Sequence, residues 1–108
     1  MSCYRFRVDT PLHASAESRS LCSMFALLPA FGLELISSTP FELWASSNSG
    51  CYRGASVYVS ALDRDCRQLF VEIRSSEPQF FMSSKAKKLA EELHCKYKTG
   101  FLCSELEP

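Results

Sequence analysis

Residues 56–74 read SVYVSALDRDCRQLFVEIR, two runs of alternating apolar and polar residues joined by a short stretch rich in charge. Alternation with a period of two residues is typical of strands with one buried face, and the intervening residues 63–67 predict the turn of a β-hairpin. A shift of one residue would destroy the match of apolar positions. With a five-residue turn, the register pairs Ala61 with Leu69, Val59 with Val71 and Val57 with Ile73 on one face. On the other face it pairs Ser60 with Phe70, Tyr58 with Glu72 and Ser56 with Arg74.

The rest of the chain predicts three more strands and two helices. Alternation places strands at residues 3–8, 33–38 and 41–46. Apolar residues at helical spacing predict one helix over about 16–28 and a second from Ser83 or Ser84 to Gly100. The order β-α-β-β-β-β-α predicts a single α+β domain over residues 1–100, an antiparallel sheet of four or five strands with two helices on one face. Residues 101–108 are expected to form either a short strand or a disordered tail.

Composition bears on the partners and the compartment. The chain has 12 Lys and Arg against 12 Asp and Glu, whereas a protein that binds duplex nucleic acid usually has a basic surplus. The Gly-and-aromatic pattern of RNA-recognition motifs is absent as well, so nucleic acid is not the expected partner. No apolar run reaches the roughly 18 residues of a membrane helix, and the N-terminus lacks the pattern of a signal peptide. The six cysteines are therefore expected to be mainly free thiols of a cytoplasmic protein.

The predicted sheet carries aromatic and charged residues on the face opposite its apolar side. Trp, Tyr and Arg are enriched at binding hot spots, and an exposed aromatic surface is typical of a site that another molecule or segment covers. We interpret this face as a surface for a protein partner or for homodimerisation. The alternative is that the tail, a long loop or incidental exposure accounts for these residues. The candidate binding residues are Trp44, Tyr58, Phe70, Glu72 and Arg74, joined by Arg5 and Arg7.

A second hypothesis is a small enzyme or small-ligand-binding domain with a pocket between the sheet and the loop 46–54. Cys51, Arg53 and His13 would line this pocket, because a nearby cation lowers the pKa of a thiol and a catalytic cysteine needs a histidine partner. Nothing in the sequence brings His13 to Cys51. The known catalytic and phosphate-binding motifs are missing, and the cysteines and histidines lack metal-ligand spacing. The sequence therefore favours a binding role over catalysis and predicts no cofactor and no metal.

Overall fold

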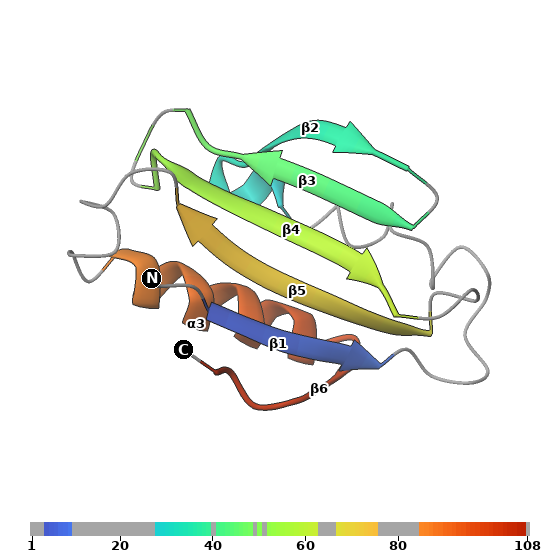
Figure 1. Ribbon diagram of the computed structural model, residues 1–108. Helices are drawn as coiled ribbons and strands as arrows, with labels where there is room; N and C mark the ends of the chain where they lie inside the picture. The colour runs from blue at the N-terminus through green and yellow to red at the C-terminus, as the bar shows by residue number, and fades with distance from the viewer. Residues whose placement is uncertain are drawn as a thin grey trace.

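Over the residues that it describes, the computed structural model shows a six-stranded antiparallel sheet and one α-helix near the C-terminal end (Figure 1). The strands lie in the order β2-β3-β4-β5-β1-β6. The expected antiparallel α+β domain is therefore confirmed. The described residues are 4–9, 28–39, 41–48, 50, 52–62, 67–75 and 85–107. The elements are β1 (Tyr4–Asp9), the short 3-10 helix η1 (Pro29–Phe31), β2 (Glu34–Ser38), β3 (Glu42–Ser46), β4 (Ala55–Ala61), β5 (Gln68–Ser75), α3 (Lys85–Lys98) and β6 (Leu102–Cys103).

The central hairpin has the predicted register. Val57 lies opposite Ile73, Val59 opposite Val71, and all the other predicted pairs between β4 and β5 are also present. The Leu62 amide donates to the Gln68 carbonyl at 2.8 Å, which closes the hairpin at the turn. The register is correct because a single alignment buries the aliphatic residues of both strands on one side, namely Val57, Val59, Leu69, Val71 and Ile73.

The expected number of strands, four or five, is too low. The sixth strand, β6, has only two residues and pairs Cys103 with Val8 and Leu102 with Asp9. Two residues are too few to produce a detectable alternation, so the sequence could offer a strand in this segment only as one of two alternatives. The first strand, predicted at 3–8 and observed as β1, lies between β5 and β6.

One face of the sheet packs against α3 and forms the core. The helix buries the side chains at its predicted stripe, and the Phe6 ring lies 4.9 Å from the His94 ring and 5.7 Å from the Tyr97 ring, measured between centroids. The second predicted helix is thus present as α3, whereas the helix predicted over 16–28 lies outside the described residues except for Leu28. That leucine is fully buried and precedes η1. The buried stripe of α3 comprises Ala86, Leu89, Ala90, Leu93 and Tyr97.

The segment that follows α3 is fastened along the outer edge of β1. The Ser104 amide donates to the Arg7 carbonyl at 2.8 Å, and the Ser104 hydroxyl accepts from the Arg7 amide at 2.7 Å. The Ser104 carbonyl also lies 2.7 Å from Nε2 of His94. Farther on, Arg5 and Glu107 exchange two backbone hydrogen bonds of 2.9 Å. None of the helices among the described residues combines the length and the apolar character needed to cross a membrane.

Candidate interaction surface and adjoining groove

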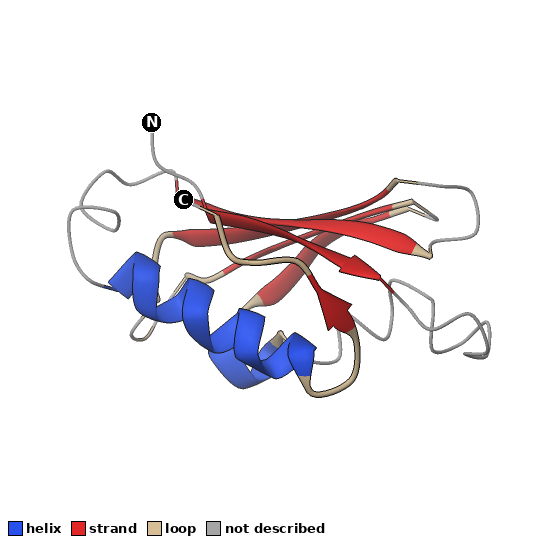
Figure 2. Cartoon of the chain, turned by 90° about the horizontal axis from the view of Figure 1, so that it is seen from below, coloured by secondary structure: helices blue, strands red, loops and turns tan. Residues whose placement is uncertain are grey.

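The sheet face opposite α3 carries no described helix, as Figure 2 shows with α3 on one side of the strands. We call this side the open face. Strand register brings the predicted binding residues together on it, because residues that pair directly across neighbouring strands point to the same side. One row across the open face consists of Trp44, Tyr58, Glu72 and Arg5. The next row consists of Glu42, Ser60, Phe70 and Arg7, and the row on the other side contains Ser46, Ser56 and Arg74.

The aromatic residues of the open face differ in exposure. Trp44 is 45% exposed and is one of the large apolar side chains left on the surface. Tyr58 and Phe70 are half-buried between their neighbours. Among these three aromatic residues, Trp44 therefore offers the largest apolar area that a partner could cover.

A network of charges fixes the side chains around Tyr58. Nη2 and Nε of Arg74 donate to Oε2 of Glu72 at 2.8 and 3.1 Å. The Arg74 guanidinium also lies 5.4 Å from the centre of the Tyr58 ring, within the range of a cation–π interaction. A hydrogen bond with Glu42 is the main cause that raises the pKa of Tyr58, followed by partial burial. The Tyr58 phenol is thus held neutral and oriented toward Glu42.

The two arginines of β1 and Glu42 lie on opposite sides of the open face, and each of these arginines also has a carboxylate beside it. Arg5 and Arg7 are on β1, and Glu42 is on β3. Arg5 has an exposed contact of 4.0 Å with Glu107, and Arg7 has one of 3.7 Å with Asp9; exposed pairs of this kind contribute little. Sequence reasoning missed Glu42 as a surface residue, although its position two residues before Trp44 on the same strand placed it on the same face.

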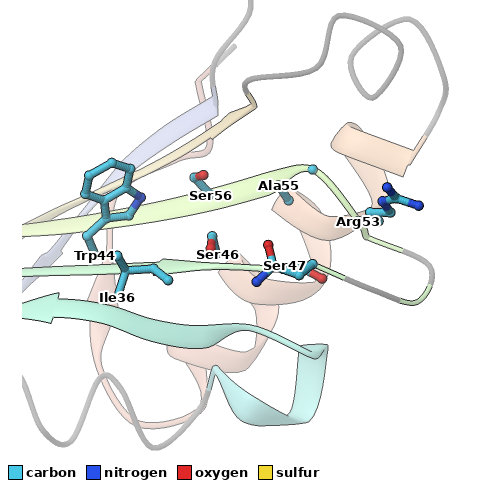
Figure 3. A pocket seen from close by; sticks show the side chains of 9 residues that line it. Ile36, Trp44, Ser46, Ser47, Arg53, Ala55 and Ser56 are labelled. Carbon is cyan, nitrogen blue, oxygen red and sulfur yellow. The ribbon is translucent and has the colours of Figure 1, made fainter.

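A groove adjoins the open face where β3 leads into the loop 47–54. Its volume is about 460 Å³. Figure 3 shows Trp44 and Ile36 at one end, Arg53 at the other, and Ser46 and Ser56 between them. The groove lies where the second hypothesis expected a pocket, and Arg53 lines it. Cys51 and His13, the other two residues of that hypothesis, lie outside the described residues.

Backbone hydrogen bonds close the loop that carries Arg53. The Ser47 amide donates to the Ala55 carbonyl at 2.9 Å, and the Gly54 amide donates to the Ser47 carbonyl at 3.0 Å. Gly54 has a φ of 93°, a conformation that a side chain disfavours. On the helix side, the Tyr52 hydroxyl donates to Oε2 of Glu92 at 2.7 Å. The loop is therefore anchored both to the sheet and to α3.

The described ranges also contain possible metal ligands and two thiols. No group of three His, Cys, Asp or Glu residues there could hold a metal ion. Cys95 is exposed and Cys103 is half-buried, and both are free thiols. Burial raises the pKa of Cys103, which makes this thiol a poorer nucleophile. Cys51 and Cys66 lie outside the described residues.

Comparisons with protein-family models, with curated proteins and with solved structures find no match to this chain.

Proposed function

We propose that this protein is a self-associating binding module whose open face packs against the open face of a second copy. The observation that supports the proposal is an aromatic sheet face with no described helix over it and with opposite charges at its two sides. Antiparallel sheets commonly leave one face to solvent, but Trp44 adds an apolar area that a partner would cover.

The charges favour a partner that is a second copy. Packed sheets in a sandwich align within about 30°, and a two-fold axis parallel to the strands, between β4 and β5, would place β3 of one copy over β1 of the other. Glu42 would then face the partner subunit's Arg7, and Trp44 would face the partner subunit's Arg5. A two-fold axis across the strands would instead place β1 over β1 and bring arginines together. The open face is thus self-complementary in the first arrangement only.

The area available predicts a weak dimer. Four strands spaced at about 4.8 Å, with six residues of about 3.4 Å each, give a flat footprint of about 400 Å² per copy. Both copies together would then bury about 800 Å², with an additional area from the side chains that project from the flat sheet. The footprint is below the 1,200–2,000 Å² of stable complexes. We expect a reversible dimer with a dissociation constant in the micromolar range or weaker.

Trp44 tests the proposal. A tryptophan buries about 150–250 Å², so a half-exposed one still offers about 100 Å², or about 2.5 kcal/mol at 25 cal/mol per Å². We expect Trp44→Ala to weaken the dimer by at least about 30-fold, the equivalent of about 2 kcal/mol. Light scattering of the reduced protein over a concentration series measures this, with circular dichroism to confirm the fold.

The matched control is Leu35→Ala. Leu35 is 43% exposed, almost as much as Trp44, but it pairs with the buried Ala45 and therefore belongs to the other face. This variant should dimerise like the wild type. A wild-type protein that stays monomeric up to about 1 mM, or a Trp44→Ala variant that dimerises normally, would refute self-association through the open face.

A further inference from the structure

The groove beside the open face has the size and the lining of a small-ligand site. Its volume of about 460 Å³ falls within the roughly 300–1,000 Å³ of ligand pockets. An apolar wall and a cationic end are separated by small polar residues: Trp44 and Ile36 form the wall, and Arg53 forms the end (Figure 3). Such sites combine apolar contact area with a few polar groups that fix the orientation of the ligand.

Arg53 is available to an anion. Among the described residues, no carboxylate forms an ion pair with its guanidinium, whereas Arg5, Arg7 and Arg74 each lie within 4.0 Å of one. The two backbone hydrogen bonds between Ser47 and residues 54–55 hold the loop that carries Arg53. A guanidinium fork suits a carboxylate or a phosphate group, with which it forms paired hydrogen bonds.

The strand geometry sets the length of the ligand. Trp44 pairs with Tyr58, and Ala55, at the Arg53 end of the groove, lies three residues earlier on β4. Three strand residues span about 10 Å. Between the two ends lie Ser46 and Ser56, which pair across β3 and β4 and carry hydroxyl groups that can donate or accept hydrogen bonds.

We propose that this groove binds an extended aromatic anion, with a planar ring against Trp44 and Ile36 and a phosphate or carboxylate group about 10 Å away at Arg53. The proposal goes beyond self-association and does not depend on it, because every residue of the groove comes from one copy.

Trp44 makes the binding measurable in a direct way. It is the single tryptophan of the chain, so the indole fluorescence reports on this wall of the groove alone. The titration uses about 50 nM protein, well below the expected micromolar dissociation constant, so the protein is mainly monomeric. The probes are adenosine diphosphate for the phosphate arm and 6-phenylhexanoate for the carboxylate arm. Adenosine and 6-phenylhexanamide lack the anion, and pyrophosphate lacks the ring.

We expect at least one of the two anionic probes to shift or quench the Trp44 emission with saturation, and its uncharged counterpart to bind about fivefold more weakly or worse. The probe that responds shows whether the groove accepts a phosphate or a carboxylate group. Arg53→Gln should weaken the binding of that probe by about fivefold, the upper end of the range for an exposed ion pair. Arg67→Gln, a matched change of an exposed arginine at the far end of the β4–β5 hairpin, should have no effect.

Two results would overturn the proposal. The first is that neither adenosine diphosphate nor 6-phenylhexanoate binds better than its control: adenosine and pyrophosphate for the former, 6-phenylhexanamide for the latter. The other is that Arg53→Gln binds the responding probe as tightly as the wild type does. Because the titration is made on monomers, either result leaves the test of self-association by light scattering unaffected.

Discussion

Reversing one charge on the open face should break the proposed dimer, and reversing its partner as well should restore it. In the arrangement with the two-fold axis along the strands, Glu42 of each copy faces the partner subunit's Arg7, so the contact occurs twice. Glu42→Arg turns both contacts into pairs of like charge. Arg7→Glu does the same from the other side, and the double variant Glu42→Arg/Arg7→Glu recreates both attractions with the signs exchanged.

The size of the effect follows from the exposure of the pair. Exposed ion pairs contribute about 0.2–1 kcal/mol each. A reversal removes this attraction and adds a repulsion of similar size, and symmetry doubles the result to about 1–4 kcal/mol. A value near 2 kcal/mol weakens the dimer by about 30-fold. Glu42→Gln, which removes the attraction without adding a repulsion, should cost about half as much.

Sedimentation equilibrium at low and at high salt measures these changes. Each single reversal should weaken the dimer by about 30-fold, and the difference from the wild type should shrink as salt screens the charges. The double variant should return to within about threefold of the wild type, less than 1 kcal/mol. If both single variants fold and dimerise normally, or if the double variant is as weak as the singles, the symmetry argument is wrong.

Two further predictions concern stability. Burial raises the pKa of Tyr97 above its ordinary value of 10.0, so the neutral phenol stabilises the fold fully below pH 10, and this contribution is lost as the pH rises above 10. In urea unfolding, the free energy of unfolding of the wild type should fall by up to about 1.4 kcal/mol per pH unit in that range. Tyr97→Phe should lose stability less steeply, and an equal slope in both proteins would exclude Tyr97 as the cause. Gly54→Ala, at a φ of 93°, should lower the free energy of unfolding by about 1–2 kcal/mol. Gly100→Ala, where an added Cβ has no neighbour within 4 Å, should change it by less than about 0.5 kcal/mol, and equal effects of the two glycine changes would contradict the strain argument.

The sequence predicted what depends on local alternation. The register of β4 and β5 followed from the match of Val57, Val59 and Val71 with their partners, and the same alternation put Trp44 and Tyr58 on one face. These inferences held because burial on one side of a strand leaves a period of two in the residue types.

What the sequence did not predict depends on long-range pairing or on very short segments. Nothing in the residue pattern placed β1 between β5 and β6, because alternation does not name the partner of a strand. Near the groove, the register of β2 shifts between Leu35 and Ser37, and Ile36 contributes to the same wall as Trp44. A one-residue bulge changes which side of the sheet a residue faces. The residue types along the strand stay the same, so the sequence does not reveal the change.

The position of β1 also has a consequence for synthesis on the ribosome. Val8 pairs with Leu69 and with Cys103, so β1 is synthesised before the other described strands, and its partners lie about 60 and 95 residues later in the chain. At about 5–20 residues per second, the nascent chain carries β1 without its neighbours for at least several seconds. During that time Phe6 and Val8, which end up fully buried, are open to chaperones and to other nascent chains. Arg5 and Arg7 alternate with these two residues. Their charges reduce the tendency of the unpaired strand to form wrong strand pairs.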